Sequence, residues 1–119
     1  MERINLKEKL DMINDHWHPR VAGELNGQHV KLVKFQGEFV WHLHEAEDEL
    51  FYVIEGNFDM EFRDKTVHLK AGEMIIVPRG VEHRPVAKEE VSVMLFEPAG
   101  TLNTGNTNGP LTRKLTENI

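Results

Sequence analysis

The sequence predicts an all-β domain of the sandwich or barrel type, preceded by a short N-terminal helix. Two observations support this prediction. Short apolar runs separated by turn residues recur between residues 21 and 98, which is typical of sandwiches and barrels and not of parallel sheets. Helical spacing of apolar residues is found in the first 20 residues, before that pattern begins. A chain of 119 residues is expected to form one domain with one core.

Residues 1–20 are predicted to form the helix and a connector. Three apolar residues recur at helical spacing, namely Leu6, Leu10 and Ile13. Asn5 and Glu8 have the spacing of a capping box, in which each side chain bonds the backbone of the other residue. The stretch 14–19 contains Asn-Asp and ends in proline, so we expect the helix to stop there.

Residues 21–98 are predicted to form the barrel, because eight stretches within them have the composition of strands. These stretches are 21–25, 29–35, 38–44, 50–54, 58–62, 66–69, 73–77 and 91–96. Asn26-Gly27 predicts a tight hairpin turn, and Gly37 predicts a bulge or bend. The tail, 99–119, is rich in Thr, Asn and Gly up to residue 110, and we expect either a surface loop or poor order there.

Charge and composition exclude several classes of function. The net charge is −6 and Lys and Arg do not cluster, which argues against nucleic acid as a main partner. The absence of cysteine excludes disulfides, thiolate ligands and cysteine nucleophiles. No apolar run is long enough to span a bilayer, and the N-terminus lacks the apolar core of a secretory signal. We therefore expect a cytoplasmic protein without membrane contact.

His42 and His44 are the most informative residues of the chain. Histidines separated by one residue fall on the same face of a strand, because strand side chains alternate between faces. Glu49 can return on a neighbouring strand toward the same point, and His83 follows a second turn region. Neutral imidazoles with one carboxylate suit a divalent transition metal (Fe, Mn, Zn, Ni or Cu) and leave positions open for water or substrate.

Two spaced motifs surround these residues. The first consists of Gly37, His42, His44, Glu49 and Gly56, and after fifteen residues the second consists of Gly72, Pro78, Gly80 and His83. Together they resemble the two signature motifs of the cupin superfamily, with the short spacer of small single-domain members. The resemblance covers about half of the chain directly.

The resemblance implies a jelly-roll β-barrel with one metal ion inside it, held by His42, His44, Glu49 and His83. Two positions depart from the usual pattern. Gly37 lies one residue closer to the first histidine, which a bulge can absorb. Ala87 stands where the second motif commonly ends in asparagine, so a specific substrate cannot be carried over from the family.

Other acids and histidines offer alternative ligands. Asp48 is the fallback carboxylate, because some family members have the acid one position earlier. His16 and His18 also have His-x-His spacing, but no matching carboxylate is near, so we interpret them as surface or packing residues. His29 and His68 are expected to face solvent from strands.

Strand alternation also predicts a pocket and a partner. The expected pocket lining is apolar and comprises Val40, Phe51, Val53, Met60, Met74 and Ile76. Phe39, Trp41 and Leu43 make the other face of the 38–44 stretch apolar too, and such a strand needs cover on both faces. We expect a homodimer packed sheet against sheet.

The sequence favours a metal-dependent small-molecule enzyme whose substrate chelates the metal through two oxygens. Oxidation of the dioxygenase type is the first expectation, and isomerisation of a sugar or related carbonyl compound is the second. Tyr52 and Glu97 are the candidate acids or bases. The alternative is a non-catalytic protein that binds or senses a small molecule. Neither the native metal nor the substrate follows from the residues.

Overall fold

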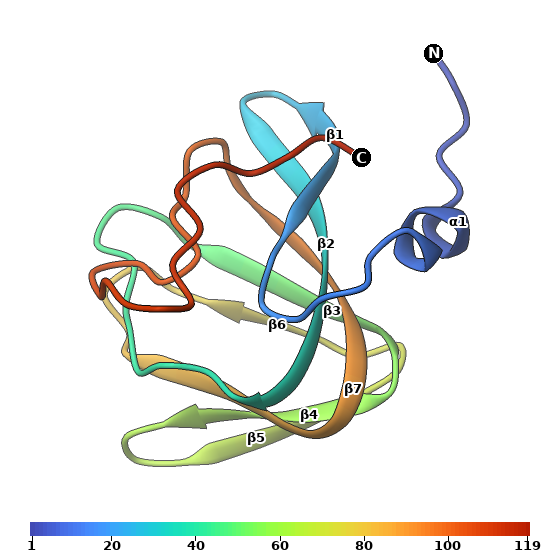
Figure 1. Ribbon diagram of the computed structural model, residues 1–119. Coiled ribbons are helices and arrows are strands. Elements are labelled where there is room, and N and C mark those ends of the chain that lie inside the picture. Colours follow the sequence, from blue (N-terminus) through green and yellow to red (C-terminus); the bar gives the residue numbers. More distant parts are fainter.

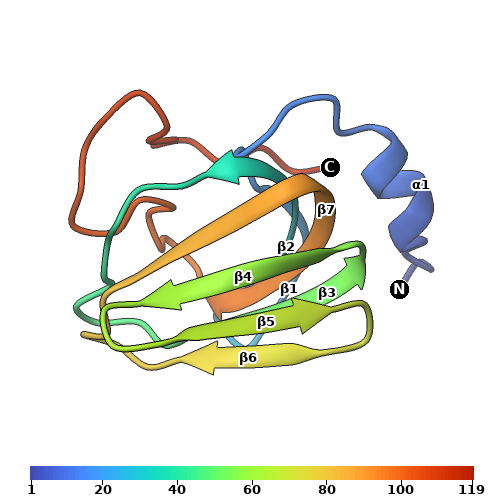
Figure 2. The same cartoon turned by 90° about the horizontal axis from the view of Figure 1, so that it is seen from below.

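The computed structural model describes residues 1–119 and consists of one short helix followed by seven antiparallel strands (Figure 1). The elements are α1 Leu6–Asp11, β1 Arg20–Leu25, β2 Gln28–Glu38, β3 Glu49–Glu55, β4 Asn57–Phe62, β5 Thr66–Lys70, β6 Met74–Val77 and β7 His83–Pro98. The sheet curls around a common interior, with α1 outside it (Figures 1 and 2). The prediction of an all-β barrel-like fold with an N-terminal helix is confirmed.

The long strand β7 organises the sheet. Five strands follow the order β1-β2-β7-β3-β6, and β4 pairs with both β5 and β7. The C-terminal half of β7 pairs with β2 and β3, for example Leu95 with Lys31 and with Phe51. Its N-terminal part pairs with β4, for example Pro85 with Met60. One continuous strand therefore joins both walls of the barrel, where the sequence predicted only a strand over 91–96.

The predicted strand over 38–44 is wrong. β2 ends at Glu38, and residues 39–48 form a loop with a single bridge, in which the backbones of His42 and His83 exchange two hydrogen bonds of 2.9 and 3.1 Å. Gly37 has a φ of 86°, and the register with β7 shifts between Phe35 and Gly37. The bulge expected at this glycine is therefore present, and it bends the chain out of the sheet.

The helix and the first hairpin follow their local signals. Glu8 N donates to Asn5 Oδ1 at 3.0 Å, which is the predicted N-cap. The helix ends at Asp11, before the stretch 14–19 in which its end was expected. Asn26 and Gly27 both have positive φ, 51° and 75°, as a type I′ hairpin turn requires.

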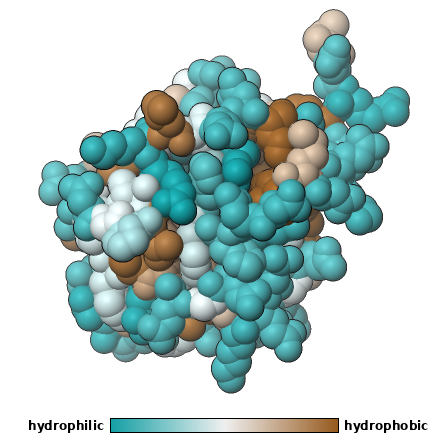
Figure 3. All heavy atoms as spheres, viewed as in Figure 1, coloured by the Kyte–Doolittle hydropathy of each residue, from teal (hydrophilic) through white to brown (hydrophobic).

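Apolar side chains form a main core inside the barrel and a smaller cluster outside it. Fourteen buried residues make up the main core, among them Phe35, Phe51 and Phe58. Leu10 and Ile13 pack against Leu32 in the smaller cluster, which attaches the N-terminal segment to the outside of β2. The face seen in Figure 3 is mainly hydrophilic, with one apolar group beside α1 and smaller ones scattered on the side away from it.

The tail, 99–119, is a loop laid along one end of the barrel (Figure 1). Its last residues are held to β1, since Val21 N donates to Glu117 O and Ile119 N donates to Val21 O. Of the two sequence expectations for the tail, the surface loop is the one that the structure shows. No helix of the chain has the length and apolar character needed to cross a bilayer.

Candidate metal centre

Three segments of the chain bring four polar side chains to one point. His42 and His44 come from the loop before β3, Glu49 is the first residue of β3, and His83 is the first residue of β7. The backbone bridge between His42 and His83 fixes the two outer segments to each other. The loop therefore directs His42 and His44 toward the same point, as the predicted strand was expected to do.

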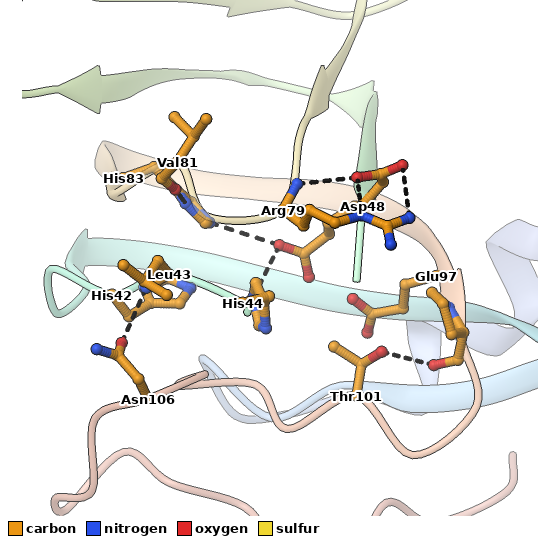
Figure 4. A network of polar contacts seen from close by, with 12 residues as sticks. His42, Leu43, His44, Asp48, Arg79, Val81, His83, Glu97, Thr101 and Asn106 are labelled. Atoms are coloured by element: carbon orange, nitrogen blue, oxygen red, sulfur yellow. Dashed lines mark hydrogen bonds and ion pairs between the residues drawn. The ribbon is translucent and has the colours of Figure 1, made fainter. Parts of the chain in front are cut away.

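His42, His44 and His83 lie close together inside the barrel (Figure 4), and Glu49 Oε1 lies within 3.5 Å of two of them. Each offers one ligand atom, and these atoms all lie within 4.8 Å of one another. Each residue is at most 3% exposed. The structure thus brings together all four residues that the family resemblance implied, in an arrangement that can hold a metal ion.

Backbone carbonyls orient two of the imidazoles. His42 Nδ1 lies 2.9 Å from Val40 O, and His83 Nδ1 lies 2.8 Å from Val81 O. Because a carbonyl oxygen only accepts, each Nδ1 carries the proton and each Nε2 keeps a free lone pair. Metal-binding histidines are held in this way in proteins, with the second ring nitrogen bonded to a carbonyl or carboxylate.

Several buried polar atoms at this point have no hydrogen-bond partner. They are both ring nitrogens of His44, Oε1 of Glu49 and Nε2 of His83. Glu49 Oε1 lies 3.3 Å from His44 Nε2 and 3.5 Å from His83 Nε2, without forming a hydrogen bond to either. Unpaired buried polar atoms are costly, and a cation between them would pair with one atom of each of the three side chains. The residues therefore fit a metal.

Charge and burial favour the metal-binding protonation states. Burial and the neighbouring His83 together lower the pKa of His42 to about 4, so His42 is neutral near pH 7. Burial raises the pKa of Glu49, but its contacts with Glu97, His44 and His83 outweigh burial and hold the pKa well below its usual range. The site presents neutral imidazole and ionised carboxylate, which are the forms that bind metal.

A buried pair that the sequence did not reveal lies beside these ligands. Lys31 Nζ lies 2.9 Å from Glu97 Oε1 and 3.3 Å from Thr101 O, and both charged side chains are almost fully buried. Burial and the adjacent Glu49 carboxylate raise the pKa of Glu97 well above its usual value, although Lys31 opposes them. No local pattern marks Lys31, because its partner is 66 residues away in the chain.

The two candidate acids or bases end up in different places. Glu97 is buried beside Glu49, as described above. Tyr52 lies on the opposite face of β3 from Glu49 and Phe51, where it is half-buried and pairs with Met74. Tyr52 is therefore not part of this site, and its assignment as a candidate is wrong.

A small apolar cavity of about 30 Å³ adjoins the ligands, enough for one or two water molecules. His42 and Glu49 reach it, and of the six predicted lining residues only Phe51 does. Val53 and Met60 are buried in the core away from the cavity, and the half-buried Val40 packs against that core.

Met74 and Ile76 contradict the predicted lining, because they are 58% and 55% exposed on the outer face of β6. The apolar run Met74–Val77 does not reveal which face of the strand points inward. Pairing with β3 decides it, because Val77 stands opposite the inward Glu49.

The alternative ligands lie elsewhere. Asp48 is exposed and accepts hydrogen bonds from Arg79, so it does not join the cluster. His16 contacts Glu90 at 2.7 Å, and the exposed His68 contacts Asp59 at 2.7 Å.

Two further histidines are partly covered. His18 packs beside Asp15, with 3.0 Å between Nδ1 and Oδ2. The side chain of His29 is only 20% exposed and its Nδ1 is buried without a partner, so the expectation that it faces solvent is wrong.

Comparison with known proteins agrees with this geometry. Residues 29–97 match the model of the cupin domain family. The solved structure of a cupin-2 domain containing protein from Shewanella frigidimarina has 52% sequence identity and a TM-score of 0.79, covering 80% of this chain and 93% of that one. A protein of known structure from Neisseria meningitidis has 34% identity and a TM-score of 0.76, covering 82% of this chain and all of that one.

Curated relatives share only part of their length with this chain. The uncharacterized protein YdbB of Bacillus subtilis is 45% identical over 62 residues, which are 51% of this chain and 55% of YdbB. The 3-hydroxyanthranilate 3,4-dioxygenase of Xenopus tropicalis is 29% identical over 102 residues, which are 79% of this chain but 36% of that enzyme. The chain therefore spans about half of the first relative and about a third of the second.

Proposed function

The chain belongs to the cupin domain family, and from this premise we propose that it binds one divalent transition metal through His42, His44, Glu49 and His83 and acts on a small molecule. The observation that carries the proposal is the set of buried ligand atoms without hydrogen-bond partners. Bound there, a metal supplies Lewis-acid or redox chemistry to a chelating substrate. Fe, Mn, Zn, Ni and Cu all suit three imidazoles and one carboxylate.

The protein's own residues contribute orientation and exclusion of water. The backbone contacts of His42 and His83 hold two rings so that both Nε2 atoms face the same point. Buried apolar side chains surround the ligands, which keeps the local dielectric low and strengthens electrostatic contacts inside. Octahedral geometry around four protein ligands leaves two positions for substrate oxygens.

Oxidation of the dioxygenase type is the reaction we favour. Its support is the similarity to 3-hydroxyanthranilate 3,4-dioxygenase over 79% of the chain, together with a ligand set that suits Fe(II). The substrate of that relative is not transferred to this chain, because the match covers 36% of the relative.

Isomerisation of a sugar or related carbonyl compound is the second candidate reaction. A chelated carbonyl group polarised by a metal of this kind is a general route to such chemistry. A putative sugar phosphate isomerase from Acidithiobacillus ferrooxidans has the same fold at 18% identity and a TM-score of 0.56, which supports the fold alone. The alternative from another class is a non-catalytic binding or sensor protein.

Oxygen consumption separates these candidates. Protein loaded anaerobically with Fe(II) and mixed with a chelating diphenol is expected to consume oxygen in proportion to the product formed. His83→Ala, which lacks one ligand, serves as the inactive control. Product without oxygen uptake from a carbonyl substrate would favour isomerisation, and saturable binding without any product would favour the sensor.

We also propose that two copies associate through the outer face of β3 and β6. Met74 and Ile76 are more than half exposed on β6, which lies at the edge of the sheet, and they pair with Tyr52 and Leu50 on β3. An apolar face of this kind favours association. Sedimentation of the protein at micromolar concentration is expected to give a dimer, and a monomer there would contradict the proposal.

A further inference from the structure

We propose that Trp17 determines which ligands reach the metal centre, and that a ligand with a single planar ring takes the place of its indole ring. This inference rests on the proposed function, because it concerns access to the same ligands. Trp17 belongs to the connector between α1 and β1, is 6% exposed, and lines the cavity that His42 and Glu49 reach.

The indole ring of Trp17 covers the aromatic wall of the cavity. It stacks on Phe35 with 4.5 Å between ring centroids and on Phe39 with 4.7 Å, at interplanar angles of 17° and 24°. Phe39 in turn meets His42 edge to face at 5.2 Å. One aromatic stack therefore leads from Trp17 to a candidate metal ligand.

The present cavity is too small for an organic substrate. At about 30 Å³ it accommodates one or two water molecules, whereas an organic ligand needs several times that space. Trp17 and the adjacent Pro19 close one side of it, and Asn103 of the tail also lines it. A substrate that chelates the metal from this cavity must therefore displace part of this wall.

Trp17 is the part of the wall best suited to move. Its φ of 60° is unusual for a bulky side chain, so the stacking and hydrogen bonds hold the backbone in an unfavourable conformation. Three hydrogen bonds hold the residue: its N donates to Lys34 O and its Nε1 to Gln36 O, each at 2.9 Å, and its O accepts from Asn103 Nδ2 at 3.4 Å. Phe35 belongs to β2, whereas Trp17 belongs to a connector without strand pairing.

The space that Trp17 would vacate defines the class of ligand. It is flat and faces the rings of Phe35 and Phe39, which favours a planar apolar ring. The polar groups at the inner end are His42 and Glu49, so the ring should carry its oxygen donors on one edge. A ring with two adjacent hydroxyl groups meets both requirements.

Fluorescence of Trp17 tests its displacement directly. The chain has two tryptophans, so in Trp41→Phe protein the emission comes from Trp17 alone. The Zn(II)-loaded protein is titrated with catechol and, as a non-planar control, with trans-1,2-cyclohexanediol. We expect catechol to shift the emission to longer wavelength and to expose Trp17 to quenching by acrylamide. Unchanged emission when calorimetry shows catechol bound would overturn the proposal.

The variants Trp17→Ala and Trp17→Phe measure the effect on affinity. A ligand that binds only an open form populated to about 10% or less loses at least about tenfold in apparent affinity. Trp17→Ala in the Zn(II) form should therefore bind catechol at least about tenfold more tightly, and Trp17→Phe should remain closer to the unmodified protein. Equal affinities in all three folded proteins would overturn the proposal.

A metal-free measurement separates this inference from the proposed function. Trp17→Ala without metal is titrated with indole by calorimetry, because an apolar cavity left by a large side chain binds a ring that fits it. We expect saturable binding to the variant and none to the unmodified protein. A protein that binds no zinc would refute the metal function, and the indole result would still decide the role of Trp17. Absence of indole binding to folded Trp17→Ala would refute the proposal that a planar ring can take the place of the indole ring.

Discussion

Two polar groups lie side by side in the interior, and they differ in how their atoms are satisfied. Lys31 and Glu97 are 2% and 1% exposed, and Lys31 has two oxygen acceptors within 3.3 Å. The ligand group is buried to the same degree, yet several of its ring nitrogens and one carboxylate oxygen have no partner. In the Lys31–Glu97 pair one buried oxygen, Oε2 of Glu97, lacks a partner, whereas four buried atoms of the ligand group do.

This difference indicates which polar group is structural and which is functional. A buried ion whose hydrogen bonds are made within the chain needs nothing from outside. A buried group with unpaired atoms aimed at a common point is destabilising until a ligand arrives. The Lys31–Glu97 pair should therefore affect stability most, and the ligand group should affect stability through protons and metal.

The largest effect should come from removing one partner of the buried pair. Glu97→Leu leaves the Lys31 ammonium with Thr101 O as its remaining acceptor, and an uncompensated buried charge costs about 4 kcal/mol. The double variant Lys31→Met/Glu97→Leu should recover most of this loss, because no charge remains. Urea denaturation measures both, with Glu97→Gln as a control that keeps an acceptor oxygen. A double variant as unstable as Glu97→Leu would contradict the structural role.

Acid should destabilise the metal-free protein through His42. Its pKa is about 4 in the fold, against 6.5 for an ordinary histidine, so between these pH values the unfolded chain binds a proton that the folded chain does not. The free energy of unfolding should therefore fall as the pH falls from 6.5 to 4. The full loss is about 3.5 kcal/mol, from 2.5 pH units (6.5 minus about 4) at about 1.4 kcal/mol each.

Urea denaturation at pH 7 and pH 4.5 in the presence of a chelator measures this loss. His42→Gln cannot bind the proton, so its stability should change less between the two pH values. His68→Gln is the matched control, because it makes the same substitution at an exposed position on β5, away from the ligand group. Identical pH dependence in His42→Gln and the unmodified protein would refute the assignment.

Metal binding should stabilise the protein by slightly less than the amount that acid removes. At a free metal concentration about 100 times the dissociation constant, the gain is about 2.7 kcal/mol. His83→Ala should lose this gain and most of the bound metal, since one of four ligands is missing. Thermal unfolding with and without Zn(II), together with elemental analysis, gives both values. Undiminished metal in His83→Ala would show that the ion binds elsewhere.

The sequence predicted the four candidate metal ligands better than the residues that line the cavity beside them. The resemblance to the two cupin motifs predicted that His42, His44, Glu49 and His83 lie together, and the structure brings them together although His42 and His44 lie on a loop and not on the predicted strand. The run Met74–Val77 is apolar throughout, so it does not indicate which face points inward, and the pairing with β3 is needed to decide. Trp17 has no pattern around it, because its stacking partners belong to a later strand.

The smallest effect should distinguish two adjacent carboxylates. Glu49 is buried in the ligand group, whereas Asp48 is exposed and its Oδ1 accepts from Arg79 N at 2.8 Å. Asp48→Asn should leave the affinity for Zn(II) within about twofold, because surface ion pairs contribute little. Glu49→Gln, the same chemical change one residue later, should lower that affinity strongly, because it removes the only anionic ligand of the group. Calorimetric titration of both variants is the measurement. Comparable losses in the two would mean that the loop before β3 rearranges when metal binds and that Asp48 then takes part.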